Sequence, residues 1–365
     1  MAEKYSGKQV IKAGEMLILD EILDDDKTFD QAFEILSYWR FSHEDALESA
    51  LDLLQRVTLK KDKKAFFAKR LKRYFSIVIK LRRFKDMKLK NMQDIGGCRA
   101  VVSNLKKVDQ VVRELKSIPE FRNTEGKVRF KDYIKQPKDD GYRGYHLIGQ
   151  FLNKEGCRRN IELQIRTQLQ HDWATTVEIV DLFTGQALKS NQGEIDWSYF
   201  FLSVSEQFAI MEQIHLFDTL DKDKKYQEYE KKLLSGNNNA EKINSSRKAQ
   251  EYARKLDVVR RLEAYANSLK IVDNRIEEES IDGYVLLEVD TAKSMVSSTF
   301  FTKEENKIAE QQYAEAEKKA TGQKGLVVAL VSTSAVGGIK EAYPNYFADS
   351  TEFLVHLIFI LKIPL

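Results

Sequence analysis

Apolar residues recur at helical spacing through the first part of the chain, between residues 16 and 56. Ser42 stands two positions before Glu44-Asp45, as an N-cap residue would at the start of a helix. The pattern predicts a helical lead-in over residues 1–58. Its apolar positions are Phe29, Ala32, Phe33, Leu36, Ala46, Leu47, Ala50, Leu51 and Leu54.

The segment Lys60–Phe84 combines many cations with apolar residues that fit one side of a helix. This pattern predicts a continuous basic amphipathic helix. Its apolar side is formed by Phe66, Phe67, Leu71, Phe75, Val78 and Ile79.

The hydrophobic period changes from about Asp94 onward, where short apolar runs alternate with one helical pattern. Asn104 is a predicted N-cap for the helix that follows the first run. Strands and helices in this order predict a mixed α/β layer. The elements are a strand at Asp94–Val102, a helix at Leu105–Ser117, a loop at Lys131–His146, strands at Tyr145–Leu152 and Asn160–Ile165, and a helix from Thr167 to about Val180.

Helical patterns dominate again after residue 185, and strand patterns return near the end of the chain. The predicted helices are Trp197–Leu220, Lys222–Leu234, Ala240–Val272, Lys303–Lys319 and an apolar terminal helix, and the predicted strands are Tyr284–Val289, Met295–Phe301 and Leu326–Val331. We therefore predict an α/β (α+β) fold with a mixed sheet flanked by helices. The predicted parts are a lead-in (1–58), a mixed-sheet domain (59–185), a helical region (186–272) and a small C-terminal α+β domain (273–365).

Composition places this chain among helix-rich globular proteins. It has 365 residues, of which 42% are hydrophobic and 32% are charged, and only four are proline. Its two cysteines, Cys98 and Cys157, lack the spacing of a disulfide framework or a zinc site. No signal peptide is recognisable, and no apolar run reaches the roughly 20 residues that span a bilayer. We expect a cytoplasmic protein without a membrane partner.

Charge is distributed unevenly along the chain. Residues 15–52 hold twelve acidic residues against two basic ones, whereas residues 60–90 hold fourteen Lys or Arg residues against two Asp. The basic segment is typical of a surface that binds phosphates, either of nucleotides or of RNA. A solvated helix face is the alternative interpretation.

The segment Lys131–His146 contains glycines, cations and aromatic residues between two apolar runs. Gly141 and Gly144 allow a close approach of the backbone to a ligand, and tyrosine rings can stack on a base. The segment suits nucleotide binding, and a polar surface loop is the alternative.

Two acidic residues belong to the predicted buried strands. Asp94 begins one strand, and alternation places Glu162, Gln164 and Arg166 on one face of another. Paired carboxylates beside cations are a common way to hold Mg²⁺ next to a polyphosphate. Salt bridges at strand ends are the alternative. His146 and His171 could orient a phosphate, or could be partly buried imidazoles with a structural role.

Five ordered motifs resemble the synthetase domain of the RelA/SpoT family of alarmone synthetases, between Arg70 and Asp181. Together they are specific, although each alone is weak. They are Arg70-x-Lys72-xxx-Ser76-xxx-Lys80, Asp94-xx-Gly97-x-Arg99, Asp132-Tyr133-Ile134-xx-Pro137-Lys138-xx-Gly141-Tyr142-Arg143-xx-His146, Glu162-x-Gln164-Ile165-Arg166-Thr167 and His171-x-Trp173-Ala174.

This resemblance implies a nucleotide pyrophosphokinase with a nucleotidyltransferase-like core, which moves the pyrophosphate of ATP to the 3′-hydroxyl of GDP or GTP. It implies Mg²⁺ as cofactor, bound by Asp94 and Glu162, with Glu162 also a candidate general base. By motif position, the ATP-binding residues are Arg70, Lys72, Ser76, Lys80 and Arg99. The acceptor-binding residues are Lys138, Tyr142, Arg143, His146, Gln164, Arg166 and His171, with Tyr142 stacking on the base.

Departures from the family pattern leave the acceptor open. Only His43 precedes His146, so we expect no hydrolase domain of the bifunctional members. Gly144 stands where Ser is frequent, and Trp173-Ala174 lacks the Glu-His pair that often follows. The alternatives are a toxic small synthetase that modifies the tRNA 3′ CCA end or makes adenosine alarmones, and a non-enzymatic RNA- or nucleotide-binding module. An antitoxin or regulatory partner at the C-terminal domain and a homo-oligomer are further hypotheses, and the Ala342–Phe347 loop is that domain's most distinctive feature.

Overall fold

Contacts divide the protein into two compact units. The computed structural model describes residues 3–19, 26–72, 74–123, 125–184, 195–235, 239–263, 283–290, 295–305, 308–309, 311–313, 315–316, 326–332 and 351–365. Unit 1 comprises residues 1–135 and 144–167, and unit 2 comprises residues 136–143 and 168–365. Within the described ranges, none of the helices combines the length and the apolar character needed to cross a membrane. The predicted division into four parts stays a prediction.

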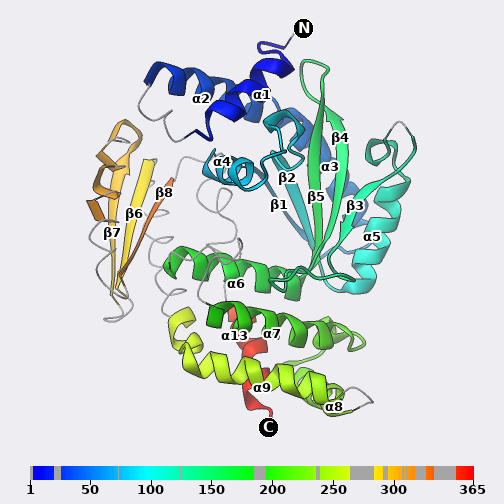
Figure 1. Ribbon diagram of the computed structural model, residues 1–365. Helices are drawn as coiled ribbons and strands as arrows, with labels where there is room; N and C mark the ends of the chain where they lie inside the picture. The colour runs from blue at the N-terminus through cyan, green and yellow to red at the C-terminus, as the bar shows by residue number, and fades with distance from the viewer. Residues whose placement is uncertain are drawn as a thin grey trace. The chain divides into compact units, whose positions relative to one another are not determined.

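A five-stranded sheet with the order β1-β2-β5-β4-β3 forms the centre of unit 1 (Figure 1). β2 and β5 run parallel, and the other neighbours run antiparallel, so the predicted mixed sheet is confirmed. Sequence reasoning missed β3: it assigned Lys131 and Asp132 to a loop, and Arg129 and Phe130 to no element. The strands are β1 (Phe66–Leu71), β2 (Gly96–Val102), β3 (Arg129–Asp132), β4 (Tyr145–Leu152) and β5 (Arg158–Thr167).

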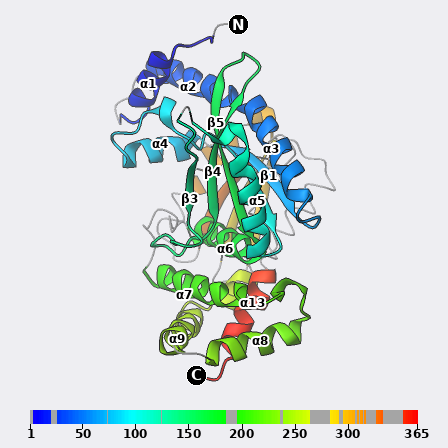
Figure 2. The same cartoon turned by 90° about the vertical axis from the view of Figure 1, so that its right-hand side faces the viewer.

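Two helices, α3 (Glu44–Leu59) and α5 (Leu105–Ser117), pack on one face of this sheet (Figure 2). The Asn104 side chain accepts a hydrogen bond from the Lys107 backbone N–H, which confirms the predicted cap of α5. The core between helices and sheet includes Leu47, Leu54, Cys98, Ala100, Val111, Leu115, Leu147, Ile161 and Leu163. Since strand side chains alternate, the intervening residues of β2, β4 and β5 belong to the other face of the sheet.

The N-terminal part adds α1 (Gly7–Met16) and α2 (Asp26–Phe41), which pack together with α4 (Tyr74–Arg83) around an apolar cluster. A reciprocal capping box between Ser6 and Gln9 starts α1. The predicted N-cap role of Ser42 is wrong: His43 occupies the cap position of α3, and the Ser42 hydroxyl instead donates to the Trp39 carbonyl.

The predicted continuous helix over Lys60–Phe84 is also wrong. Its first half is the strand β1, and only the second half forms the helix α4. Phe67 and Leu71 contact the core from one side of β1, whereas Arg70 belongs to the opposite side. The apolar residues of this segment fit a helical period, but pairing with β2 satisfies the backbone of residues 66–71 as a strand.

The described helical residues of unit 2 fall mainly into five helices. They are α6 (Gln168–Thr184), α7 (Ile195–Glu212), α8 (Lys222–Leu234), α9 (Asn239–Lys255) and α13 (Thr351–Lys362). The terminal helix α13 contacts α6, α7 and α9, and the Gln250 amide donates to the carbonyls of Ile360 and Ile363 at its end. The helix predicted over Ala240–Val272 is interrupted after Lys255, where Asp257 adopts a positive φ of 49°. Residues 258–263 are helical again, and residues 264–272 lie outside the described residues.

A second sheet of the protein belongs to unit 2. Its strand order is β7-β6-β8, and neighbouring strands run antiparallel. Its strands β6 (Gly283–Asp290), β7 (Met295–Thr302) and β8 (Leu326–Ser332) confirm the three predicted ones. Of the helix predicted over Lys303–Lys319, residues 303–305 form a 3-10 turn, whereas the described residues 308–309, 311–313 and 315–316 are helical. Residues 317–319 lie outside the described residues. In the described ranges, 3-10 turns also occur at Leu89–Asn91, Pro119–Phe121 and Phe217–Thr219. The Ala342–Phe347 loop lies outside the described residues.

Candidate active site

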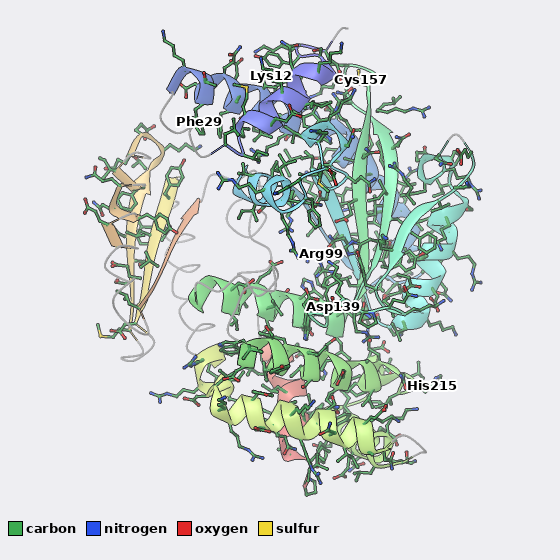
Figure 3. The ribbon with its side chains drawn as sticks, in the orientation of Figure 1. Lys12, Phe29, Arg99, Asp139, Cys157 and His215 are labelled. Atoms are coloured by element: carbon green, nitrogen blue, oxygen red, sulfur yellow. The ribbon has the colours of Figure 1, made fainter. Side chains whose placement is uncertain are left out.

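Polar side chains form rows across the sheet face opposite α3 and α5. The strand register aligns Arg70 of β1 with Gly97 of β2, and Gly97 with Glu162 of β5. Because aligned residues share a face, the missing side chain of Gly97 leaves space between Arg70 and Glu162. The next row aligns Arg99, labelled in Figure 3, with Gln164 and His146. Two predicted ATP-binding arginines therefore share this face with Glu162.

Glu162 is held by a hydrogen-bonded network on β5. Its Oε1 lies 3.1 Å from His146 Nδ1, and its Oε2 accepts a bond of 2.7 Å from the Gln164 amide. The Gln164 oxygen in turn accepts a bond of 2.6 Å from Arg166. Burial raises the pKa of Glu162, but attraction to His146 and the two hydrogen bonds outweigh it and lower the pKa to about 2. The predicted charged face of β5 is confirmed, with Glu162 ionised near neutral pH.

Asp94 lies two residues before β2 and pairs with two lysines. Its Oδ2 is 3.0 Å from Lys72 Nζ and 2.8 Å from Lys80 Nζ. Burial raises the pKa of Asp94, and attraction to these two ammonium groups reverses the effect and lowers it. Burial is also the main reason why the pKa of Lys72 is lowered, although Asp94 opposes this. Lys72 follows β1 directly and Lys80 belongs to α4, so only Lys80 lies on a helix as predicted.

The two carboxylates influence each other electrostatically. Glu162 raises the pKa of Asp94, and Lys80 lowers the pKa of both. In the described part of the chain, Asp94 Oδ1 is buried without a hydrogen-bond partner. A buried carboxylate oxygen without a partner is costly unless a cation or water occupies it. Two ionised carboxylates with this spare oxygen suit a hard cation such as Mg²⁺.

Four of the predicted acceptor-binding residues belong to unit 2. Lys138 Nζ lies 4.7 Å from the centre of the half-buried Tyr142 ring, and the Trp173 ring centre lies 6.5 Å from it. Arg143 forms a buried ion pair with Glu212 of α7. His171 is buried in α6. The other three, His146, Gln164 and Arg166, belong to the strands β4 and β5 of unit 1.

Sequence reasoning missed several residues that contact predicted site residues. The Tyr133 ring lies edge-on to His146 with 5.2 Å between ring centres, and Asp140 accepts a hydrogen bond from the Tyr142 backbone. Ser205 and Glu212 of α7 contact the Gly141–Arg143 segment. Tyr133 stood within a quoted motif, but nothing local marked the two α7 residues. Ser76 is exposed on α4.

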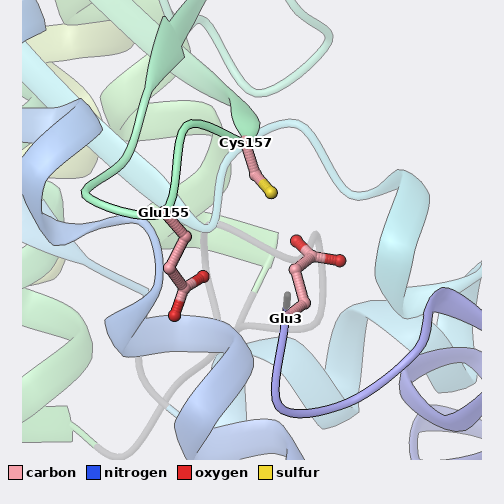
Figure 4. A group of neighbouring side chains, drawn as sticks. All are labelled: Glu3, Glu155 and Cys157. Carbon is pink, nitrogen blue, oxygen red and sulfur yellow. The ribbon is translucent and has the colours of Figure 1, made fainter. Parts of the chain in front are cut away.

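Glu3, Glu155 and Cys157 form a second group of nearby ligand atoms, within 4.8 Å of one another (Figure 4). The carboxylates already have protein partners. Glu3 accepts a hydrogen bond of 2.5 Å from Arg159, and Glu155 accepts bonds from Tyr38 and Asn153. These contacts account for the group without a metal.

Comparison with known proteins matches residues 69–179 to the region found in RelA and SpoT proteins. Over 115 residues the chain is 36% identical to the GTP pyrophosphokinase YwaC of Bacillus subtilis, and over 116 residues it is 34% identical to YjbM of the same organism. These matches cover 29% and 30% of this chain and 52% and 53% of those proteins. The chain thus spans about half the length of these relatives.

A crystal structure of the small alarmone synthetase 1 from Bacillus subtilis, bound to its product pppGpp, is also similar. The identity is 24% and the TM-score 0.42, over 48% of this chain and 93% of that one. For the structure of a GTP pyrophosphokinase family protein from Streptococcus pneumoniae, the identity is 21% and the TM-score is 0.41. This match covers 53% of this chain and 96% of that one. The family match includes Arg70, Asp94, Tyr142 and Glu162. The chain therefore carries a RelA/SpoT region at residues 69–179, and the resemblance seen in the five motifs is confirmed.

Proposed function

We propose that this protein is an ATP:nucleotide 3′-pyrophosphotransferase that acts on GDP or GTP. In this reaction the acceptor 3′-oxygen forms a bond to the β-phosphorus of ATP, and the bond between that phosphorus and the α,β-bridging oxygen breaks. AMP leaves, and the hydroxyl loses its proton. The products are AMP and the alarmone ppGpp or pppGpp.

The paired carboxylates Asp94 and Glu162 are the observation that carries this proposal. Both have lowered pKa values despite their burial, and Lys80 acts on both. Pyrophosphoryl transfer needs alignment and charge stabilisation more than covalent help from the protein. A cluster of fixed charges around two ionised carboxylates supplies both. The similarity to proteins named GTP pyrophosphokinases supports the same reaction class.

Cations of unit 1 suit the binding of ATP phosphates. Lys72 and Lys80 already neutralise one oxygen of Asp94, and Arg70 lies exposed on the same sheet face as Glu162. We assign these three side chains, with Ser76, to the phosphates and Arg99 to the adenine. Mg²⁺ bound by Asp94 and Glu162 would draw charge from the β- and γ-phosphate oxygens. Asp94 Oδ1 is the ligand atom that the fold leaves for it.

Glu162 is assigned a position beside the acceptor hydroxyl. A carboxylate with a pKa of about 2 is a weak base, so it suits metal binding and acceptance of a hydrogen bond better than storage of a proton. His146 and Gln164 fix its orientation. The remaining acceptor residues are assigned as the motifs imply, with Tyr142 stacking on the base.

Acceptor-dependent transfer of label tests the proposal. The protein is incubated with Mg²⁺, γ-³²P-labelled ATP and one acceptor at a time, either GDP, GTP, AMP or bulk tRNA. We expect label on GDP and GTP, and one AMP formed for each pyrophosphate moved. Asp94→Asn should abolish transfer, whereas Asp86→Asn, at an exposed aspartate next to α4, should not.

Each other outcome has a defined meaning. Label on tRNA alone would replace the alarmone assignment by the tRNA-modifying one, and label on AMP alone would replace it by synthesis of adenosine alarmones. If no acceptor gains label but nucleotides bind, the chain is a binding module. Release of ADP in place of AMP would contradict pyrophosphoryl transfer altogether.

A further inference from the structure

Residues 138–142 form a closed turn on which Tyr142 is presented. The Gly141 N–H donates to the Lys138 carbonyl at 2.8 Å, and the Lys138 N–H donates to the Tyr142 carbonyl at 3.1 Å. The Asp140 carboxylate accepts a bond of 2.8 Å from the Tyr142 N–H. Gly141 has a φ of +88°, which other residues rarely adopt. The turn therefore has a defined shape of its own.

Helix α7 fixes this turn at its tip. The Ser205 hydroxyl donates to the Gly141 carbonyl at 2.5 Å in a buried environment. A Cβ atom at Gly141 would lie 3.1 Å from Leu202 Cα and 3.2 Å from Ser205 Cβ, so the backbone rests directly on the helix. Only glycine allows an approach this close.

A second contact lies two helical turns further along α7. Glu212 pairs with Arg143, and their side chains are only 3% and 9% exposed. Ser205 and Glu212 are seven residues apart and so lie on one face of the helix. Gly141 and Arg143 immediately flank Tyr142. The base-stacking residue of the proposed function thus lies between two points that one helix holds.

We propose that Ser205 and Glu212 are positioning residues for the acceptor, which act by fixing the backbone on both sides of Tyr142. This inference rests on the proposed function and deepens it. Both residues lie on α7, beyond the RelA/SpoT region at 69–179, so they would fix the acceptor site from outside that region. The buried ion pair also gives the Arg143 guanidinium a structural partner.

The test separates acceptor binding from ATP binding. KM for the acceptor, KM for ATP and kcat are measured for the full chain and for Glu212→Gln, Ser205→Ala and Glu206→Gln. Glu206 is an exposed acid on the same helix, so its variant is the matched control. We expect the acceptor KM to rise about tenfold in the first two variants, with ATP KM within about twofold of the parent protein. The control should match the parent protein.

Thermal unfolding of each variant accompanies the kinetics. If Glu212→Gln does not fold, Ser205→Ala, which leaves no buried charge unpaired, decides the question. An unchanged acceptor KM in an active, folded Ser205→Ala variant overturns the positioning role alone. Equal losses for ATP and acceptor also overturn it, because they indicate a general structural effect. A parent protein that labels no guanine nucleotide overturns the proposed function, and the inference with it.

Discussion

At the scale of single residues, Asp94 and Glu162 remain charged although they are partly buried. Burial raises the pKa of both, yet Lys72 and Lys80 reverse the effect for Asp94, and His146, Gln164 and Lys80 reverse it for Glu162. Buried charges persist only where such partners compensate the loss of water. Carboxylates held in this way stay ionised and can interact with a charged ligand.

Replacement of Glu162 by Gln tests the need for its charge. The amide has nearly the same shape and can still accept from Gln164, but it neither attracts His146 nor binds a cation as strongly. We expect kcat for transfer to fall by at least about 100-fold, the typical size of such catalytic contributions. Glu120→Gln, at an exposed position, is the control. Substantial turnover by a folded Glu162→Gln protein would contradict the assigned role.

Tyr142 offers a second test at this scale. Stacking of a base on an aromatic ring is worth about 1–3 kcal/mol. Tyr142→Ala should therefore weaken acceptor binding about tenfold or more and leave ATP binding nearly unchanged, as titration with each nucleotide would measure. Tyr142→Phe keeps the ring and should retain most of the affinity. Equal losses for both nucleotides would argue against stacking.

At the scale of elements, the loop that carries Tyr142 takes its shape from a helix distant in sequence. Ser205 and Glu212 contact residues 64 and 69 positions earlier. The strand β1 is likewise defined by its neighbour β2, with Arg70 aligned to Gly97. Both elements depend on partners that their own sequence does not reveal.

Gly141→Ala measures how tightly the turn rests on α7. The new methyl group would meet the α7 backbone and occupy a positive φ, whereas Gly126 has a φ of +76° with open space around it. A residue forced into such a conformation costs about 1–3 kcal/mol. We expect Gly141→Ala to lower the midpoint of thermal unfolding more than Gly126→Ala, because only the former adds a clash. Equal effects would mean that the turn can move away from the helix.

At the scale of the whole molecule, each unit contains a buried histidine whose pKa is lowered, His43 in unit 1 and His356 in unit 2. Burial, and secondarily Arg159, lowers the pKa of His43 in unit 1 to about 4. Burial, and secondarily Lys225, does the same for His356 in unit 2, also to about 4. The His356 ring is surrounded by Phe208, Phe217 and Phe359. Both imidazoles are therefore neutral in the folded protein near pH 7.

These histidines predict a loss of stability in mild acid. Below a pH of about 6.5 the unfolded chain binds protons at these positions, while the folded chain does so only near pH 4, so unfolding is favoured as the pH falls between those values. Each histidine lowers the free energy of unfolding by roughly 3 kcal/mol as the pH falls across this range. Denaturant unfolding at a series of pH values from 7.5 to 4 measures the slope of the free energy of unfolding against pH.

His356→Phe should make the free energy of unfolding less dependent on pH, because a phenyl ring fits an aromatic environment and does not bind a proton. His215→Gln is the control, since His215 is exposed. An unchanged slope in His356→Phe would contradict the buried neutral state of His356.

The sequence by itself determined which residue types stand together and where several elements begin. The cap at Asn104, the alternation on β5 that groups Glu162 with Gln164 and Arg166, and the ordered motifs between Arg70 and Asp181 were all readable. These features depend on residues a few positions apart, and local spacing directly reports them.

Tertiary structure decided what distant partners contribute. Phe66–Leu71 became a strand because β2 supplied its hydrogen bonds, and Arg143 acquired Glu212 as a partner through the packing of α7. The lowered pKa of Asp94 likewise depends on Lys72 and Lys80, which reach it from different elements. No periodicity records such pairings, because they arise when separate segments bury their surfaces against one another.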